Sequence, residues 1–475
     1  MSVRVGGAAD APSFPDAAKA LVRNTQLRHN VRHATRVIRR KRDQAVGELP
    51  DWQQLRDAGH TIKQHTLRYL DSYLQQFEQA CTRAGGKVHW ARDADEANSI
   101  VTGIIRGCQS TEVIKVKTMT SDETGLNAAL EAAGITPIET DLADLIIQLG
   151  EDQPSHIVVP ALHRNRMEVR QIFLEKMKLV ELGDRPDDLA QAARLYLREK
   201  FLRVKVGISG ANFLVAETGS VCMVESEGNG RMCVTLPQVL VTLAGIEKII
   251  PTFRDLEVFL QILPRSATGE RMNPYNSLWT GVAPEDGPEE FHVVLLDNGR
   301  TNVLSDPETS ETLDCIRCGA CLNACPVYQQ TGGHAYGSIY AGPIGAILTP
   351  QLQAMEHSQS LPYASSLCGA CYEVCPVKIN IPEILIHLRA KVVERGHGPL
   401  MEKVTMRTAG FMLTDGARLG AAQKLGRLGQ IPFERGGQLH HLPGLLAGWT
   451  AGRDLDAIPE QSFRDWWAER EEARA

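Results

Sequence analysis

Short apolar runs alternate with longer segments of helical periodicity between residues 70 and 300. The pattern predicts strands at 87–91, 113–119, 136–141 and 155–160, and amphipathic helices at 66–86, 94–109, 127–134 and 143–150. Apolar strands separated by amphipathic helices are typical of a parallel sheet that is covered on both faces. The sequence therefore predicts an α/β domain over residues 70–300.

The stretch from Ala211 to Gly230 has a different pattern, because its apolar runs are broken by glycine and asparagine. Such breaks predict an antiparallel hairpin that is added to the α/β domain. The rest of the chain divides into three regions. These are a charged helical region at 1–69, a cysteine-rich region with helix-like connections at 301–395, and a glycine-punctuated helical tail at 396–475.

The composition is that of a globular protein, with 43% hydrophobic residues and a net charge of -6 among 475 residues. The negative charge argues against a general nucleic-acid binder, so no nucleic-acid partner is expected. Residues 23–42 are an exception, with eight Arg or Lys and no acidic residue. We interpret this segment as a helix that faces solvent or a partner, rather than one that contacts phosphate or lipid.

The sequence contains no pattern that would direct the chain into or across a membrane. Its longest apolar run, which begins at Cys233, is shorter than the roughly 20 residues that a bilayer crossing needs. Residues 1–20 lack the apolar stretch of a signal peptide. We therefore expect a cytoplasmic protein without a transmembrane segment, and peripheral membrane contact stays open. In that reducing compartment, clustered cysteines are expected to bind metal rather than form disulfides.

The first cysteine run has the spacing C-x2-C-x2-C-x3-C-P, which is that of bacterial [4Fe–4S] proteins. It consists of Cys315, Cys318, Cys321 and Cys325, followed by Pro326. Turns with two intervening residues direct several thiolates at one face of a cube, and backbone N–H groups of the same loop can donate to its sulfides. The x3 step then places the fourth thiol one helical turn away, where it reaches a neighbouring cluster.

The second run supplies the reciprocal partner, since Cys371 and Cys375 repeat the x3 step before Pro376. An exchange of ligands between the runs predicts two [4Fe–4S] clusters. The predicted ligands are Cys315, Cys318, Cys321 and Cys375 for cluster one, and Cys325, Cys368 and Cys371 for cluster two. A zinc site made of two C-x2-C pairs would leave three cysteines at this spacing unexplained.

Cluster two lacks a fourth cysteine, because Ser365 stands where the spacing calls for one. Three alternatives follow: a [3Fe–4S] cluster, a [4Fe–4S] cluster with Ser365 or a non-protein ligand on the odd iron, or an open iron that acts as a Lewis acid on substrate. Two clusters that exchange ligands favour electron transfer, because a Lewis acid needs only one cluster.

Polar residues of the α/β region form a candidate pocket for a small hydroxy acid or another carboxylate. The candidates are Glu217, Asn229, Arg231 and His163, with Ser209, Asn212, Glu225, Glu227, Arg164 and Lys117 as further members. Arginine is suited to bidentate binding of a carboxylate. Each residue could equally lie on the surface or cap a helix, and no catalytic residue is assigned. A nicotinamide site has little support, because no G-x-G-x-x-G follows a strand.

Several long motifs occur in one order along the chain. They are "PALHRNR" from Pro160, "GISGANFLVAETGSVCMVESEGNGR" from Gly207, "SSLCGACYEVCPV" from Ser365 and "FRDWW" from Phe463. In these motifs the sequence resembles the lactate utilization protein B family of iron–sulfur oxidoreductases. The two cysteine runs with "GSIYAGPIGAIL" between them are similar to the α-helical ferredoxin module of the succinate dehydrogenase iron–sulfur subunit.

The resemblance implies a lactate-utilization domain similar in fold to the phosphosugar isomerase and CoA-transferase group. An all-α ferredoxin domain with two [4Fe–4S] clusters, the second with three cysteines, and a helical tail would follow. It also implies an electron-transferring subunit that works with two other subunits to oxidise L-lactate to pyruvate. Two rival functions stay open. One is an electron-transfer subunit of another 2-hydroxyacid dehydrogenase, although such relatives carry C-C-G motifs and no cysteine follows Cys375. The other is a Lewis-acid enzyme that uses the open iron.

Overall fold

The computed structural model describes residues 12–353, 355–396 and 400–473. The beginning of the predicted N-terminal region, residues 1–11, therefore lies outside the described residues, as do 397–399 and 474–475 of the predicted tail. The chain forms two compact units, Met1–Arg395 and Gly396–Ala475. The two units are described separately.

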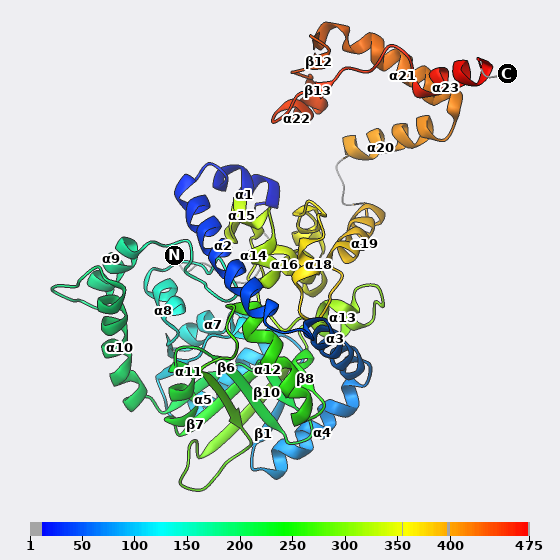
Figure 1. Ribbon diagram of the computed structural model, residues 1–475. Helices are drawn as coiled ribbons and strands as arrows, with labels where there is room; N and C mark the ends of the chain where they lie inside the picture. The colour runs from blue at the N-terminus through cyan, green and yellow to red at the C-terminus, as the bar shows by residue number, and fades with distance from the viewer. Residues whose placement is uncertain (1–11, 354, 397–399, 474–475) are drawn as a thin grey trace. The chain divides into compact units, whose positions relative to one another are not determined.

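A six-stranded parallel sheet is the framework of the first unit (Figure 1). In spatial order its strands are β1 (Lys87–Ala91), β10 (Glu290–Leu296), β7 (Val239–Gly245), β4 (Val206–Ser209), β2 (Glu112–Lys115) and β3 (Thr136–Glu139). Every neighbouring pair is parallel, which confirms the parallel sheet that the apolar runs predict. In such a sheet the carboxyl ends of all strands meet at one edge, where ligands usually bind.

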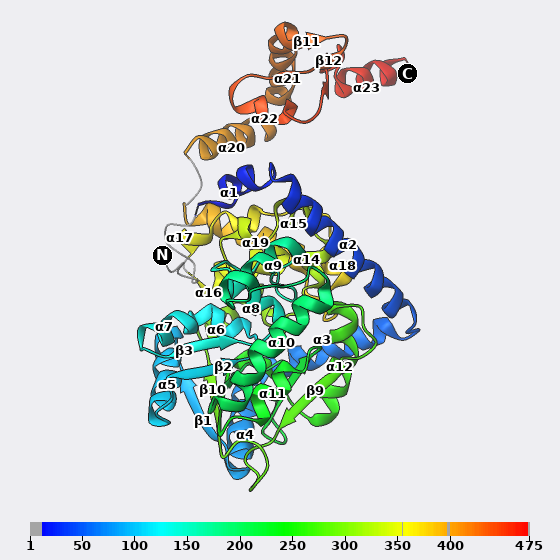
Figure 2. The same cartoon turned by 90° about the vertical axis from the view of Figure 1, so that its left-hand side faces the viewer.

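Helices cover both faces of this sheet (Figure 2). One face packs against α5 (Ala94–Gly107) and α7 (Leu126–Ala132). The other packs against α4 (Leu70–Arg83), α8 (Leu142–Leu149), α9 (Arg166–Lys176), α10 (Pro186–Arg203) and α11 (Asn229–Thr235). Along β10, Val293 contributes to the second core and Val294 to the first, as the period of two in a strand requires.

A second sheet of four strands lies beside the first. Its order is β8 (Ile249–Ile250), β5 (Phe213–Val215), β6 (Ser220–Glu225) and β9 (Tyr275–Trp279). Strands β5 and β6 pair antiparallel, so the predicted hairpin is confirmed. The helices α6 (Met119–Thr124) and α12 (Phe253–Ala267) and the 3-10 turn η1 (Ile246–Lys248) complete this part of the unit.

The strand predicted at 155–160 is wrong, because these residues form an irregular loop. The backbone N–H of Ser155 donates to the carbonyl of Pro160 within the loop. The Nδ1 atom of His156 accepts hydrogen bonds from the N–H groups of Val158 and Val159, at 3.0 and 3.1 Å. A side chain and a turn thus satisfy the backbone groups that a strand would offer to a neighbouring strand.

The described residues of the cysteine-rich region form short helices and 3-10 turns joined by loops, and they pack against the N-terminal helices and the second sheet. The N-terminal helices are α1 (Phe14–Leu21), α2 (Thr25–Gly47) and α3 (Trp52–Arg68). Those of the cysteine-rich region are α13 (Arg300–Leu304), η2 (Ser310–Asp314), α14 (Ala320–Ala324), α15 (Tyr328–Thr331), η3 (His334–Tyr336), α16 (Gly342–Leu352), α17 (Met355–Ser358), η4 (Leu361–Tyr363), α18 (Ala370–Val374) and α19 (Ile381–Glu394). One apolar core joins all three parts, so the cysteines lie inside the first unit.

The second unit contains the helices expected for the tail, and also a small antiparallel sheet. Its helices are α20 (Leu400–Leu413), α21 (Gly416–Gln430), α22 (Ala447–Thr450) and α23 (Phe463–Glu472), with short 3-10 turns at Ile431–Phe433 and Gly444–Leu446. The strands are β11 (Glu434–Arg435), β12 (Gln438–Leu439) and β13 (Leu455–Asp456). In neither unit does a described helix combine the length and apolar character that membrane crossing requires.

Candidate metal centre and adjoining cavity

The two cysteine runs adopt the same local backbone. In the first run, Arg317 and Gly319 have positive φ angles of 61° and 73° on either side of Cys318. In the second run, Leu367 and Gly369 have φ angles of 54° and 80° on either side of Cys368. Left-handed backbone is uncommon for residues other than glycine, so its recurrence at matching positions marks a repeated loop. In both runs a short helix follows, α14 in the first and α18 in the second.

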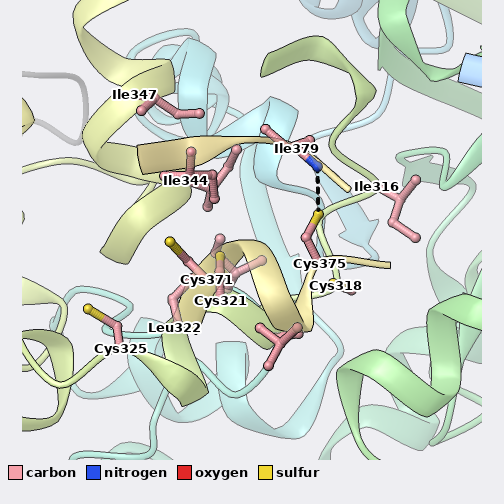
Figure 3. Packing of buried hydrophobic residues seen from close by; sticks show 14 of the residues in the cluster. Ile316, Cys318, Cys321, Leu322, Cys325, Ile344, Ile347, Cys371, Cys375 and Ile379 are labelled. Carbon is pink, nitrogen blue, oxygen red and sulfur yellow. Dashed lines mark hydrogen bonds between the residues drawn. The ribbon is translucent and has the colours of Figure 1, made fainter. Parts of the chain in front are cut away.

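The packing of α14 against α18 brings the two runs together (Figure 3). The seven thiols then fall into two neighbourhoods. Burial raises the pKa of Cys375, and the nearby thiols of Cys318 and Cys315 raise it further. Burial likewise raises the pKa of Cys325, with Cys368 as its thiol neighbour.

The remaining two cysteines extend these neighbourhoods. Burial raises the pKa of Cys371 to about 11, and its thiol neighbours are Cys325 and Cys368. Cys321 has Cys315, Cys318, Cys371 and Cys375 as neighbours, so it lies where the two groups meet. One group therefore holds three thiols of the first run and one of the second. The other holds two thiols of the second run and one of the first.

The donor set and its surroundings fit iron–sulfur clusters. Five of the seven thiols are buried within an apolar shell that includes Ile316, Leu322, Ile344, Ile347 and Ile379 (Figure 3). Backbone N–H groups point at the sulfur atoms of Cys315, Cys325 and Cys375, at 3.4, 3.5 and 3.4 Å. Buried cysteines with backbone donors and a dry shell are what cluster ligands require.

Ser365 occupies the place in the second loop that Cys315 occupies in the first. The N–H of Arg317 donates to the Cys315 sulfur at 3.4 Å, and the N–H of Leu367 donates to the Ser365 Oγ at 3.1 Å. Arg389 holds this loop through the carbonyl oxygens of Pro362, at 2.9 Å, and Ser365, at 3.4 Å. The Ser365 hydroxyl therefore accepts the same backbone hydrogen bond in the second loop that the Cys315 sulfur accepts in the first.

Two arginines of the N-terminal helices fix the second run, and the sequence did not identify either. Arg42 donates to the carbonyl of Val374 at 3.1 Å, and Arg56 donates to those of Cys375, at 2.8 Å, and Tyr372, at 3.0 Å. These carbonyls lie at the carboxyl end of α18, where a cation is favourable. The interpretation of residues 23–42 as a helix that faces solvent or a partner is thus wrong for Arg42, which is 7% exposed.

A buried network of ion pairs connects the first cysteine loop to the carboxyl edge of the parallel sheet. Arg300 pairs with both oxygens of Glu123, each at 2.9 Å, and with Glu247 at 2.5 Å. Glu247 also pairs with Arg317 of the loop at 3.2 Å, and the hydroxyl of Tyr340 donates to Glu123 at 2.5 Å. The loop that carries Cys315 and Cys318 is therefore fixed by charge-assisted hydrogen bonds.

The environment of Glu247 keeps it ionised. Burial raises its pKa, but the guanidinium groups of Arg300 and Arg317 outweigh this effect and bring the pKa to about 2. Gly245, at the end of β7, permits this arrangement, because a Cβ atom there would lie 2.1 Å from a Glu247 oxygen and 2.4 Å from the Arg300 Nε. Glycine is thus required for close approach at this edge.

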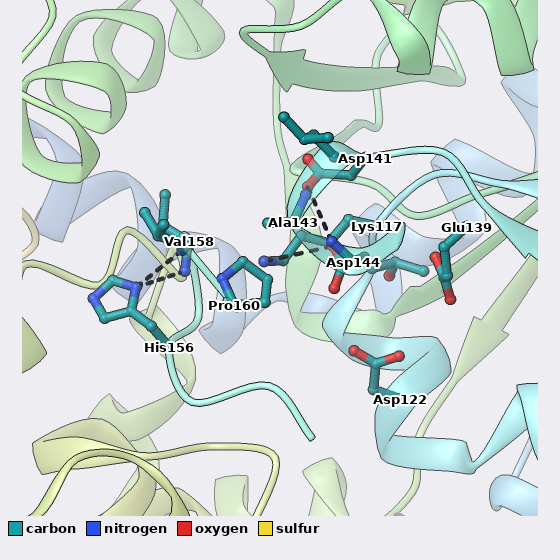
Figure 4. A network of polar contacts seen from close by, with 12 residues as sticks. Lys117, Asp122, Glu139, Asp141, Ala143, Asp144, His156, Val158 and Pro160 are labelled. Carbon is teal, nitrogen blue, oxygen red and sulfur yellow. Dashed lines mark hydrogen bonds and ion pairs between the residues drawn. The ribbon is translucent and has the colours of Figure 1, made fainter. Parts of the chain in front are cut away.

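A cavity of about 400 Å³ lies at the same edge of the sheet, between the α/β domain and the first cysteine loop. Its wall includes Lys117, Asn212, Glu225, Glu227, Asn229, Lys248, Asn273, Arg317 and Tyr340. Figure 4 shows the part of this wall around Lys117, whose Nζ lies 3.8 Å from Asp144. Burial lowers the pKa of Lys248 to about 7, with Arg317 as the second cause.

The four candidate pocket residues have different locations. Asn229 lines this cavity. Glu217 is exposed and accepts a hydrogen bond from the N–H of Phe253, and Arg231 is exposed on α11. His163 forms hydrogen bonds to Asp152 at 2.9 Å and Ser155 at 2.7 Å, outside the cavity wall.

Family models match successive parts of the chain. Residues 74–296 match the LUD domain, 311–379 the 4Fe-4S dicluster domain, and 388–472 the C-terminal domain of lactate utilisation protein B. Lactate utilization protein B of Bacillus subtilis (strain 168) is 41% identical, over 99% of this chain and 98% of that protein. The protein of the same name from Exiguobacterium sp. (strain ATCC BAA-1283 / AT1b) is 43% identical, over 96% of this chain and 97% of that protein.

Proposed function

This chain belongs to the lactate utilization protein B family, and from that premise we propose that it is the iron–sulfur electron-transfer subunit of a system that oxidises L-lactate to pyruvate. The coarser conclusion, an iron–sulfur component of lactate utilisation, follows from the family and the dicluster domain. Two other subunits complete the proposed system, which we place in the cytoplasm. The α/β domain is proposed to share the fold of the phosphosugar isomerase and CoA-transferase group, and the cysteine domain to be an all-α ferredoxin.

The observation that supports electron transfer is the exchange of cysteines between the two runs. Cys375 lies with the thiols of Cys315 and Cys318, while Cys325 lies with Cys368. Such crossed ligation holds two clusters close together, which suits the passage of single electrons from one to the other. Oxidation of lactate to pyruvate releases two electrons and two protons, and each proposed [4Fe–4S] cluster takes one electron at a time.

The ligands of the proposed clusters are Cys315, Cys318, Cys321 and Cys375 for cluster one, and Cys325, Cys368 and Cys371 with the hydroxyl of Ser365 for cluster two. When bound, the clusters supply reversible one-electron chemistry. The protein buries them, donates hydrogen bonds to cysteine sulfur, and orients the loops through Arg42, Arg56 and Arg317.

The function is tested by mixing the anaerobically reconstituted chain with the two other subunits and L-lactate, and recording EPR spectra of the clusters. Lactate is expected to reduce the clusters only when all three proteins are present. Clusters that dithionite reduces, but that stay oxidised with lactate and both partners, would contradict the electron-transfer role. Equal reduction by glycolate and no reduction by lactate would favour another 2-hydroxyacid dehydrogenase.

The Ser365→Ala variant tests the fourth ligand of cluster two. Removal of the hydroxyl is expected to release about one of the four irons on mild oxidation, because the odd iron loses its protein ligand. The EPR signal of a [3Fe–4S] cluster should then grow at the expense of cluster two. Ser366→Ala is the matched control, since Ser366 is the exposed neighbour in the same loop. If both variants behave as the wild type does, Ser365 is not a ligand.

A further inference from the structure

We propose that the cavity at the carboxyl edge of the sheet binds a small hydroxy- or oxo-carboxylate, with its carboxylate group against Lys248 and Arg317. Binding of a carboxylate in this cavity does not depend on the proposed electron-transfer function. Only the choice of L-lactate and pyruvate as ligands rests on that proposed function.

Two buried cations of this wall have unused hydrogen-bonding capacity. Arg317 is 9% exposed, and its Nη1 atom has no hydrogen-bond partner. Lys248 is 8% exposed and forms no hydrogen bond or ion pair with any described residue. A buried donor without a hydrogen-bond partner is costly, so the free Nη1 of Arg317 and the amine of Lys248 on one cavity wall indicate a site for an anion, in addition to the ion pair of Arg317 with Glu247.

The nearest carboxylate is already engaged and does not supply that anion. Glu247 uses one oxygen for Arg300, at 2.5 Å, and the other for Arg317, at 3.2 Å. Its backbone carbonyl accepts a hydrogen bond from Lys63. The cations at this end therefore have hydrogen bonds left for an anion that enters the cavity.

The wall also carries two glutamates, Glu225 and Glu227. Glu225 accepts hydrogen bonds from the backbone N–H groups of Gly228 and Arg231, both at 2.9 Å, and Glu227 accepts one from Leu142 at 3.0 Å. Carboxylates here repel a ligand carboxylate, but they can accept a hydrogen bond from a hydroxyl group. The cavity wall thus carries both cations and hydrogen-bond acceptors, as binding of a hydroxycarboxylate requires.

Arg317 connects the cavity to cluster one. Its guanidinium lines the cavity, while its backbone N–H donates to the Cys315 sulfur. A carboxylate at Lys248 and Arg317 therefore lies against the loop that holds a ligand of cluster one. The volume of about 400 Å³ is in the range of small-molecule sites.

The test is calorimetric titration of the holoprotein with L-lactate and, separately, with pyruvate. Lys248→Met removes the cation while keeping the length of the side chain, and should weaken binding by about tenfold to hundredfold, the loss of one charge-assisted hydrogen bond. Ala211→Phe, which fills the cavity without changing charge, should weaken binding as well. Lys205→Met is the matched control, because Lys205 is exposed and lies outside the cavity wall.

Binding of either acid to wild type and Lys205→Met, with loss in both cavity variants, would support the proposal. No binding of either acid to the wild-type holoprotein would overturn it. The proposal would also be overturned if Lys248 only balanced the charge of cluster one. In that case Lys248→Met would shift the reduction potential of cluster one but would bind both acids as the wild type does. Iron content is measured on the same samples. Binding of either acid to protein without reducible clusters would contradict the electron-transfer function and would leave this proposal standing.

Discussion

Replacement of Cys318 by serine is expected to abolish cluster one and lactate-dependent electron transfer. The thiol is buried beside Cys315 and Cys375 in the first neighbourhood, and no other described cysteine lies in position to replace it. Iron content should fall by about half, and the transfer rate to below about one hundredth of wild type, because a lost ligand costs more than a lost outer-shell contact. Iron analysis and EPR on anaerobically prepared protein measure both effects.

Cys108→Ser is the matched control for this substitution. Cys108 lies at the end of α5, away from the cysteine runs, and its thiol donates to the carbonyl of Ile104 at 3.2 Å. A serine hydroxyl can make the same hydrogen bond, so iron content and electron transfer should not change. Retained electron transfer in Cys318→Ser would remove cluster one from the path.

Replacement of Arg300 by methionine is expected to destabilise the first unit by about 3–5 kcal/mol, the cost of leaving buried charges without their partner. Arg300 is fully buried, and its loss would leave both oxygens of Glu123 without a cation and Glu247 with Arg317 alone. Because Glu247 also fixes the first cysteine loop, the variant should lose iron faster than wild type. Urea denaturation under anaerobic conditions measures the free energy of unfolding.

Arg254→Met is the matched control, since Arg254 is exposed on α12. This variant should unfold within about 0.5 kcal/mol of wild type. If Arg300→Met has the same free energy of unfolding as the Arg254→Met control, the network does not stabilise the fold. Unchanged iron retention would show that it does not hold the cysteine loop.

Apolar periodicity predicted three of the six strands of the parallel sheet, β1, β2 and β3, and did not identify β4, β7 or β10. The run KVHWA became β1 over the predicted residues, as an edge strand of which only Ala91 is fully buried. The run at 155–160 failed, since the imidazole of His156 takes two backbone N–H groups that a strand would use. Hydrophobic periodicity does not show whether one side chain will accept hydrogen bonds from the backbone in this way.

The cavity was harder to predict than the cysteine loops. Cysteine spacing is local, so one turn of backbone determines which thiols meet. The cavity instead draws Lys117, Lys248 and Arg317 from three distant segments, and only the folded sheet brings them together. One signal was present in the sequence: the adjacent charges Glu247 and Lys248 interrupt an apolar run from Val239 to Ile250. Charges inside such a run indicate a buried polar network.

Arg42 illustrates a further limit of composition. Its segment is strongly basic, which favoured a solvent-facing helix. Yet one side of α2 is buried, and at helical spacing it carries Leu27, Val31, Arg42 and Ala45. A cation on an apolar stripe must find a partner, and here the partner is the carbonyl of Val374.

The crossed ligation of two clusters is the central claim, and EPR of dithionite-reduced Cys375→Ser tests it most directly. Cys375 belongs to the second run by sequence, but its thiol lies with those of Cys318 and Cys315. The account predicts that Cys375→Ser loses the same cluster signal as Cys318→Ser and keeps the signal that Cys325→Ser loses. Crossed ligation would be contradicted if Cys375→Ser lost the same signal as Cys368→Ser and kept the signal of the cluster that Cys318 binds.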